Sequence, residues 1–375
     1  MRRLGLIFTL NVSVEQWKKQ GLLNREKLLY EEHLKKKSLD QVFWFSFGKD
    51  DQKYERDLKG IRIVPMPGLF DSRIGRLMYS FIMPFWHRKI FKNIDIIKTN
   101  QMPGSWSALL GKLLFRKRSL LRTGWTWSIN YREEISSRFN LIYWMIQLIE
   151  WISYKFCDLA EVSSAAQRKY IIEKYHIDKK KIGLLPNYID VSLFKNRTAL
   201  HNRREELLYI GRLEKEKNLF NLIKASADLK IRLNIYGEGS LKKDLLVLAE
   251  KIGAKVFFNR PVSNEKLPLV YNKYTYFILP SFYECMPKVL LEAMACGCIC
   301  FGTDTSGINE IINDKKNGYL IRGTESGSII KKVTGVVKLS NKEKKPCSDN
   351  ASDLIKERFT LQSLVSHEEK FLDRL

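Results

Sequence analysis

The chain has 375 residues and a formal net charge of +24 at pH 7, and 45% of its residues are hydrophobic. This length is too great for one ordinary domain and suits two, and the hydrophobic content excludes a wholly disordered chain. The charge is uneven, because residues 1–200 carry +17 of the total. A first half this basic predicts an acidic partner, for which anionic lipid, a phosphorylated acceptor and nucleic acid all qualify.

Short apolar runs alternate with longer amphipathic runs along the first half, as in proteins that pair strands with helices. Strands are predicted at residues 4–10, 42–47, 61–65, 95–99, 120–123 and 158–163, and helices at 21–37, 105–115 and 165–175. Residues 185–202 are polar and rich in turn formers, so a domain boundary is expected there.

The second half repeats the alternation. Strands are predicted at residues 207–210, 232–236, 256–258, 276–279 and 299–302, and helices at 218–226, 241–252, 288–295 and 361–375. Residues 333–350 are interpreted as a polar, Lys-rich excursion. The predicted class is α/β, with two doubly wound parallel sheets in series. We expect domains over residues 1–198 and 199–355, and a terminal helix within residues 356–375.

The six cysteines and five histidines show no spacing typical of a metal site. Cys296, Cys298 and Cys300 alternate with other residues, so in a strand they would share one face and could not easily form disulfides with one another. Reduced cysteines fit a cytoplasmic protein. No secretory signal and no apolar run of about 20 residues is recognised, so no membrane-spanning segment is expected.

Two carboxylates flank the start of a predicted helix in the second half. Glu284 lies in the turn after the strand 276–279, and Glu292 lies about one turn inside the helix that begins near Pro287. In open α/β sheets, ligands bind beyond the carboxyl ends of strands, and a helix N-terminus favours a phosphate. The carboxylates could accept hydrogen bonds from sugar hydroxyls. Alternatively, Glu284 caps the helix and Glu292 forms a surface pair.

A glycine and two cations follow the strand 207–210. Gly211 begins the turn, and Arg212 and Lys217 precede the next helix. These cations could hold a diphosphate and stabilise the charge that develops as it leaves. The alternative is a solvated Lys/Glu run. Residues 237–239 read Gly-Glu-Gly after a strand, but they lack the last glycine of the dinucleotide-binding pattern.

Taken together, these motifs resemble those of the retaining, GT-B-fold glycosyltransferases of group 1, or family 4. The matching residues are Gly211, Arg212, Lys217, Asn218, Glu284 and Glu292. The likeness extends over residues 158–320. The resemblance implies two Rossmann-like domains facing each other across a cleft, with the terminal helix returning to the first domain.

The resemblance also implies a role for each residue. Glu292 would bind the ribose of a nucleotide-diphosphate sugar, and Glu284 would meet hydroxyls of the transferred sugar. Arg212 and Lys217, following Gly211, would hold the diphosphate. Backbone N–H groups near Met286, Lys288 and Val289 would face sugar and phosphate. Neither an essential metal ion nor a cofactor is implied, and no protein nucleophile is required for retention.

The sequence departs from the family pattern at three places. Cys285 stands where many members have glycine, and Gly21 is the only glycine where many have a Gly-Gly phosphate loop. Arg122 and Thr123 stand near the position where many members have a histidine. Gly21, Arg122 and Thr123 are therefore candidates for the acceptor side, with a structural role as the alternative for Arg122 and Thr123.

Aromatic and basic residues mix within residues 79–92, and aromatic residues are frequent in residues 139–156, as at a lipid interface. The alternative is that these aromatics pack the core or the interdomain cleft. We expect a peripheral protein on the anionic inner face of the cell membrane, acting on a saccharide or lipid-linked saccharide in polysaccharide or lipopolysaccharide synthesis. The rival functions are a basic nucleic-acid-binding protein, a sugar isomerase or phosphorylase relative of the same fold, and a non-catalytic GT-B scaffold.

Overall fold

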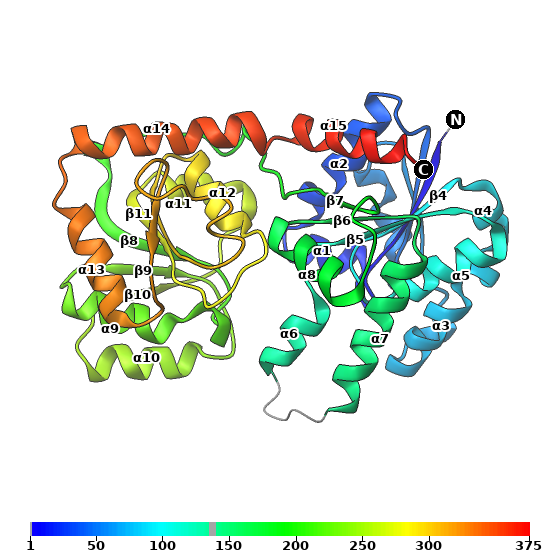
Figure 1. Ribbon diagram of the computed structural model, residues 1–375, viewed down its shortest axis with the longest axis horizontal. Helices are drawn as coiled ribbons and strands as arrows, with labels where there is room; N and C mark the ends of the chain where they lie inside the picture. The colour runs from blue at the N-terminus through cyan, green and yellow to red at the C-terminus, as the bar shows by residue number, and fades with distance from the viewer. Residues whose placement is uncertain (1, 135–139) are drawn as a thin grey trace. The chain divides into compact units, whose positions relative to one another are not determined.

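The computed structural model describes residues 2–134 and 140–375, and the chain divides into two compact units (Figure 1). Unit 1 comprises Met1–Leu185 and Val365–Leu375, and unit 2 comprises Pro186–Leu364. Residues 186–198, which the sequence assigned to the first domain, thus belong to unit 2. Each unit has a parallel sheet with helices packed on it, which confirms the predicted fold class.

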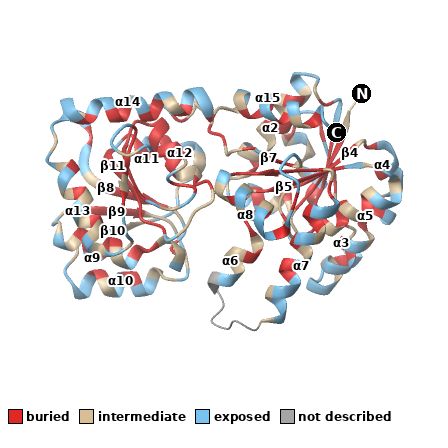
Figure 2. Cartoon of the chain, viewed as in Figure 1, coloured by how far each residue is buried: buried red, intermediate tan, exposed pale blue. Residues whose placement is uncertain are grey.

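Unit 1 is built on a seven-stranded parallel sheet with the order β3-β2-β1-β4-β5-β6-β7. Its strands are β1 Arg3–Ile7, β2 Gln41–Phe45, β3 Ile61–Val64, β4 Ile96–Thr99, β5 Arg118–Thr123, β6 Leu159–Val162 and β7 Ile182–Leu184. The strand residues are almost all buried, because helices cover both faces of the sheet (Figure 2).

The helices of unit 1 include several that the sequence analysis did not delimit. They are α1 Val14–Lys19, α2 Leu23–Lys35, α3 Arg73–Trp86, α4 Arg88–Asn93, α5 Ser105–Phe115, α6 Trp127–Glu134, α7 Leu141–Phe156 and α8 Ala165–Tyr175. Helices α3, α5 and α7 pack in that order as one layer, while α2 lies on the other side of the sheet (Figure 1). No helix among the described residues is both long enough and apolar enough to cross a bilayer.

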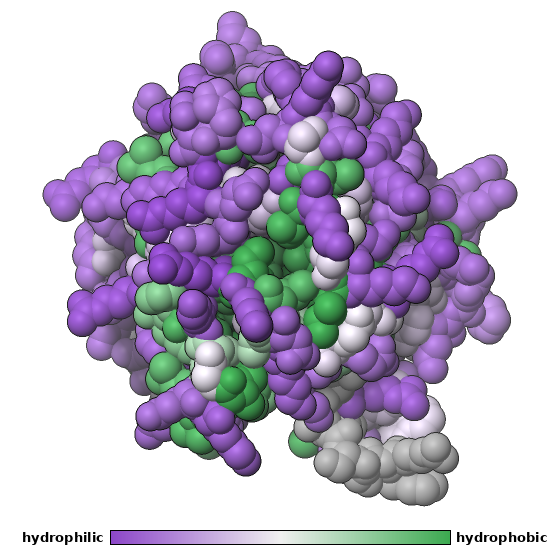
Figure 3. Space-filling view, turned by 90° about the vertical axis from the view of Figure 1, so that its left-hand side faces the viewer, coloured by the Kyte–Doolittle hydropathy of each residue, from purple (hydrophilic) through white to green (hydrophobic). Residues whose placement is uncertain are grey.

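Unit 2 is built on a six-stranded parallel sheet with the order β10-β9-β8-β11-β12-β13. Its strands are β8 Arg204–Ile210, β9 Leu233–Tyr236, β10 Val256–Asn259, β11 Tyr274–Leu279, β12 Ile299–Thr303 and β13 Tyr319–Ile321. Its helices are α9 Leu219–Asp228, α10 Lys242–Lys251, α11 Leu267–Tyr271, α12 Lys288–Ala295, α13 Ser326–Val337 and α14 Asn341–Arg358. The face drawn in Figure 3 is largely hydrophilic, with hydrophobic side chains gathered around one hollow.

The prediction of a polar excursion at residues 333–350 is wrong, because α13 and α14 occupy most of it. Ser340 and Glu343 form a capping box that starts α14. Ala351 and Ile355 of α14 are buried, four residues apart on one face of the helix. The lysines of this segment led to the prediction of a loop. Most of them are exposed, as the polar residues of an amphipathic helix usually are.

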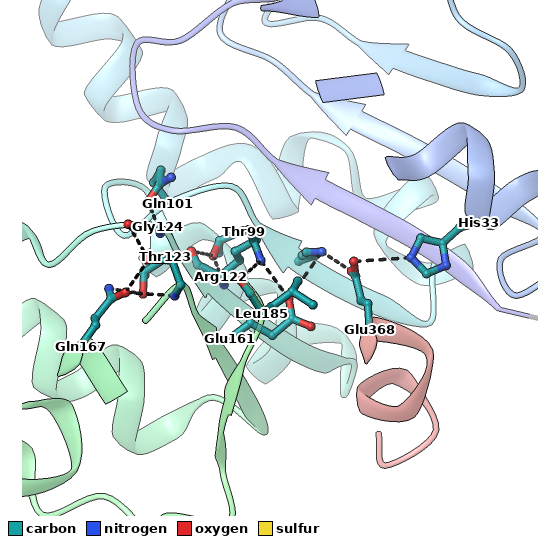
Figure 4. A network of polar contacts seen from close by, with 12 residues as sticks. His33, Thr99, Gln101, Arg122, Thr123, Gly124, Glu161, Gln167, Leu185 and Glu368 are labelled. Carbon is teal, nitrogen blue, oxygen red and sulfur yellow. Dashed lines mark hydrogen bonds and ion pairs between the residues drawn. The ribbon is translucent and has the colours of Figure 1, made fainter. Parts of the chain in front are cut away.

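The last helix, α15 Leu361–Leu372, returns to unit 1 with its final residues. Phe371 packs so closely on β7 that a Cβ at Gly183 would lie 1.6 Å from its ring. Glu368 forms an ion pair with Lys98 of β4, and its other oxygen is 3.4 Å from Nε2 of His33 on α2 (Figure 4). All three side chains are buried, so the return of the chain end is fixed by charge as well as by packing.

A second carboxylate shares Lys98. Glu161 of β6 is fully buried, with Oε2 3.6 Å from Lys98 Nζ, and neither of its oxygens accepts a hydrogen bond. Burial is the main cause that raises the pKa of Glu161 to about 7. Lys98, by contrast, holds the pKa of Glu368 well below its usual range despite burial. Of the two carboxyl groups, Glu161 is therefore the one that keeps its proton up to neutral pH.

This difference predicts a pH dependence of stability. The folded pKa of Glu161 lies above the unfolded value, so between about pH 5 and 7 the folded state binds more protons, and stability falls as the pH rises. Relative to a Glu161→Gln variant, the wild type should lose on the order of 2 kcal/mol of unfolding free energy between pH 5 and 8. Tryptophan fluorescence during urea unfolding reports this for unit 1 alone, since all eight tryptophans lie in residues 17–151.

The exposed Glu173 of α8 provides the matched control. A Glu173→Gln variant should follow the wild-type curve at every pH, because this carboxylate is mostly in solvent. Parallel curves for the wild type and Glu161→Gln across the pH range would contradict the assignment of the proton to Glu161.

Candidate functional site

The site in unit 2 begins at the switch point of its sheet. Strands β8 and β11 are neighbours, although the chain passes from β8 to β9 on the opposite side before it reaches β11. The segments that follow these two strands therefore emerge side by side, at the edge where open α/β sheets bind ligands. A backbone hydrogen bond of 2.9 Å from Phe282 N to Glu216 O joins the two segments.

A cation–carboxylate pair lies across this junction. Lys217 Nζ is 2.7 Å from Glu284 Oε1, and the two side chains are only 14% and 12% exposed. Ser281 Oγ donates to the same carboxylate oxygen at 2.8 Å. The structure thus brings together Lys217 and Glu284, which are 67 residues apart in sequence. Glu284 makes its contacts with these side chains, and no side chain caps α12.

The loop that carries Glu284 is supported from behind by Gly307. This glycine has φ +74°, and a Cβ there would lie 2.4 Å from the Cys285 carbonyl oxygen and 2.5 Å from that of Glu284. Any side chain at residue 307 would therefore be strained and would displace the loop. Asn187 Nδ2 also holds the loop, donating to the Met286 carbonyl oxygen at 2.7 Å.

Glycines also shape the other side of the junction. A Cβ at Gly237 would lie 1.9 Å from the Gly211 carbonyl oxygen, and a Cβ at Gly239 would lie 2.4 Å from that of Leu213. Leu213 N donates to Glu238 O at 2.9 Å, so the turns after β8 and β9 pack backbone against backbone. The Gly-Glu-Gly motif thus has a packing role, which residue spacing alone did not reveal.

Arg212 takes a different position from Lys217. Its side chain is 73% exposed, and its guanidinium forms an ion pair of 2.8 Å with Glu216. Its backbone is fixed, because Tyr209 OH donates to the Arg212 carbonyl oxygen at 2.8 Å. The structure therefore presents one cation held against Glu284 and a second on an exposed side chain beside the same turn.

Glu292 is buried, so its alternative as a surface pair is wrong. Its Oε2 accepts from Tyr271 OH at 2.9 Å, and its Oε1 accepts from Asn264 Nδ2 at 3.4 Å. Burial and this carboxylate raise the pKa of Tyr271 well above its usual value, so the phenol stays a donor. Tyr271 and Asn264 were missed by the sequence analysis, because neither lies in a recognisable motif.

The first turn of α12 completes this site. Met286 is buried just before the helix, and Lys288 and Val289 are its first two residues. The N-cap is Pro287, which offers no side-chain acceptor for the N–H groups of the first turn. Lys288 Nζ lies 5.9 Å from the centre of the Tyr188 ring. The positive end of α12 thus begins next to the loop that carries Glu284.

The candidates in unit 1 do not gather into a comparable site. Gly21 follows α1 and is not in a loop directly after β1. Thr123 Oγ1 is buried and lies 3.3 Å from Gln167 Nε2 (Figure 4). It also lies 3.0 Å from Tyr154 OH. Arg122 lies 3.9 Å from Glu161 Oε2 and donates to the Leu185 carbonyl oxygen at 3.4 Å. These contacts give Arg122 and Thr123 structural roles.

Two Rossmann-like units, with polar groups collected at the switch point of the second, define the class of GT-B glycosyltransferases. Two family models match the chain: "Glycosyl transferases group 1" at residues 190–353 and "Glycosyltransferase Family 4" at residues 32–193. The chain belongs to this group 1 / family 4 of glycosyltransferases, which confirms the resemblance seen in the sequence.

Individual relatives agree with the family. An uncharacterised glycosyltransferase of Methanocaldococcus jannaschii is 26% identical over 83% of this chain and 81% of its own length. The N-acetylgalactosamine-N,N'-diacetylbacillosaminyl-diphospho-undecaprenol 4-alpha-N-acetylgalactosaminyltransferase of Campylobacter jejuni is 32% identical over 47% of this chain; the match spans half of that relative. Anabaena HepE, solved with UDP and glucose, matches the whole fold with a TM-score of 0.77 at 15% identity, covering 100% of both chains.

The packing behind Glu284 gives a direct test of the site. Gly307→Ala should lower the melting temperature by about 2–10 °C, the effect of roughly 1–3 kcal/mol of strain in a unit of this size. Glycosyl transfer should fall as well, because the displaced loop carries Glu284. Calorimetry and a transfer assay measure the two effects. Gly335→Ala in α13, where a Cβ meets nothing within 4 Å, should leave both unchanged or raise stability slightly.

Proposed function

We propose that the protein is a retaining hexosyltransferase that moves a sugar from a nucleotide-diphosphate sugar to a hydroxyl of a saccharide acceptor. The observation that carries this proposal is the Lys217–Glu284 pair beside the uncapped start of α12. One cation, one carboxylate and a helix N-terminus match the diphosphate and the hydroxyls that such a donor presents side by side.

Two positively charged side chains support the departure of the diphosphate. Lys217 and the exposed Arg212 would neutralise the negative charge that grows on it as the bond from the anomeric carbon breaks. The acceptor hydroxyl would attack from the same face and pass its proton to the departing phosphate oxygen, so configuration is retained. In this proposal Lys217 and Arg212 neutralise the charge that a metal ion neutralises in other enzymes. No metal or cofactor takes part.

Glu284 would act as the acceptor of hydrogen bonds from the transferred sugar. Lys217 and Ser281 both contact its Oε1, so Oε2 has capacity for a hydroxyl. Glu292, held in place by Tyr271 and Asn264, would bind the ribose hydroxyls. Gly211 lets the turn after β8 pass close to the ligand, and N–H groups near Met286, Lys288 and Val289 would face the sugar and phosphate.

We further propose a lipid-linked saccharide as acceptor, in the synthesis of a cell-surface polysaccharide or lipopolysaccharide. The enzyme would lie peripherally on the inner, cytoplasmic face of the cell membrane. The Campylobacter relative supports the acceptor, because its name describes transfer to a saccharide on undecaprenyl diphosphate. The basic first half supports the location, because an anionic leaflet attracts cations. The two family matches favour a glycosyltransferase over a nucleic-acid-binding protein or a scaffold protein.

Removing either member of the central pair should abolish most of the activity. Lys217→Ala and Arg212→Ala should each lower kcat/KM roughly 10- to 150-fold, because a charged hydrogen bond is worth about 1.5–3 kcal/mol. Glu284→Ala should lower kcat/KM further, because it also leaves the largely buried Lys217 without its carboxylate partner. Lys215→Ala is the matched control, since Lys215 is an exposed lysine in the same short turn. Wild-type rates in Lys217→Ala would refute the proposal.

A change at Glu292 should separate binding from chemistry. Glu292→Gln keeps the size of the side chain but loses the charge, so the dissociation constant of the donor should rise roughly tenfold or more. Turnover at saturating donor should change much less. A thermal-shift panel of sugar nucleotides identifies the donor first, and calorimetric titration then measures its affinity. Unchanged affinity in Glu292→Gln would remove Glu292 from the donor site.

A further inference from the structure

An apolar stripe runs along the outside of α3. Ile74, Leu77, Met78, Phe81 and Phe85 are each 45–73% exposed. Their spacing of three, four, seven and eleven residues places them on one face of the helix. Water normally faces polar side chains at such positions, so this stripe is not explained by the fold of unit 1.

Helix α7 carries a second stripe on the outside of the same layer. Leu141, Trp144, Met145, Leu148 and Trp151 are each 40–78% exposed, and their spacing of three, four, seven and ten residues also places them on one side of the helix. Helix α5 packs against both α3 and α7, so the two stripes belong to one helical layer. We call the exposed apolar residues of α3 and α7 the outer apolar face.

The inward side of α7 carries polar side chains beside the buried Ile146 and Tyr154, whereas a helix in water usually turns its apolar residues inward. Glu150 is fully buried and accepts from Ser128 N at 3.1 Å and from Tyr175 OH at 2.5 Å. Ser153 Oγ lies 2.7 Å from Ser105 Oγ of α5. Polar groups thus anchor the helix to unit 1 and leave its apolar side outward, as expected for a helix that meets an apolar medium.

The exposed charged residues within helices α3, α4, α5 and α7 are all basic. Helices α3, α4 and α5 contain no acidic residue, and the only one in α7 is the buried Glu150. Arg88, Lys89 and Lys92 are exposed on α4, directly after α3.

Asp71 pairs with Arg76 of α3 and Asp158 with Lys112 of α5, so the remaining excess of positive charge lies mainly on α4. A surface that combines apolar stripes, tryptophans and such an excess of cations complements the interface of an anionic bilayer.

We propose that the outer apolar face docks on an anionic phospholipid bilayer, with the stripes of α3 and α7 among the acyl chains and the cations of α4 at the headgroups. The inference deepens the proposed function, on which it rests for the presence of a lipid-linked acceptor at the membrane. A second copy of the chain is a poorer occupant, because a two-fold contact through this face would bring the same cations together.

Vesicle flotation of the full chain tests the proposal. Wild-type protein should float with vesicles of 30% phosphatidylglycerol in phosphatidylcholine at low salt, and much less with pure phosphatidylcholine or at high salt. Tryptophan emission should shift to the blue on binding, because Trp144 and Trp151 leave water. Fluorescence reports only on unit 1, which contains every tryptophan.

Two sets of variants separate the apolar and the charged contributions. The apolar set is Ile74→Gln, Met78→Gln, Met145→Gln and Leu148→Gln combined, which should lower the partition coefficient roughly tenfold or more. The charge set is Arg88→Gln, Lys89→Gln and Lys92→Gln, which should lower it roughly fivefold per cation and weaken its salt dependence.

Matched controls change the same kinds of residue on unit 2. Four exposed apolar residues, Leu246, Val247, Ile252 and Leu269, are replaced by glutamine in one control. In the other, the exposed Lys243, Lys251 and Lys255 are replaced by glutamine. Both controls should float like the wild type. Unchanged circular dichroism and nucleotide-sugar binding in the test variants establish that they fold.

Several results would overturn the docking face. The wild type could fail to float, the test variants could float as well as the wild type, or the unit 2 controls could lose as much vesicle binding as the test variants. A dimer in light scattering that the apolar set dissociates, in a protein that does not bind vesicles, would also overturn the docking face. The proposed function is tested separately. A protein that floats but binds no sugar nucleotide would refute that function and leave the docking face standing. A protein that transfers sugar to a water-soluble acceptor but does not float would refute the docking face and leave glycosyl transfer standing.

Discussion

The adjacency of strands β8 and β11 is the constraint on which the site of unit 2 depends. Because β11 lies beside β8, the turn after each strand opens at the same edge of the sheet. Lys217 and Glu284 meet there as a pair that is largely removed from solvent. A charge in such a position is costly without its partner, so the pair fixes both turns in the geometry that a ligand would find.

The support behind this pair is mostly backbone packing. Gly307 lies against the carbonyl groups of Glu284 and Cys285, and Gly237 lies against that of Gly211. Contacts this close leave no room for side chains, so the loops are held by rigid neighbours and not by long flexible residues. Arg212 is the exception, because its exposed side chain can reorient when a ligand arrives.

Unit 1 holds several ionisable groups in its interior. Lys98, Glu161 and Glu368 lie under the returning chain end, and Glu150 anchors α7. Because Glu150 accepts from the Ser128 backbone and the Tyr175 hydroxyl, α7 is held by polar contacts on its inward side. The same layer can therefore expose apolar side chains while staying attached to its sheet.

The sequence by itself determined the α/β class, most strand positions, the family and the four charged residues of the proposed donor site. These features are encoded locally, in hydrophobic alternation and in short motifs with fixed spacing. Arg212, Lys217, Glu284 and Glu292 could be named because each lies in such a motif. The helix at residues 341–358 was missed for the same reason, since its lysines obscured the local pattern.

Only the tertiary structure decided which of these residues meet. It paired Lys217 with Glu284, directed Arg212 to Glu216, and buried Glu292 against Tyr271 and Asn264. It also placed Glu368 beside Lys98, 270 residues away. Strand order and the return of the last helix create these contacts, and both depend on packing between distant segments that no local pattern records.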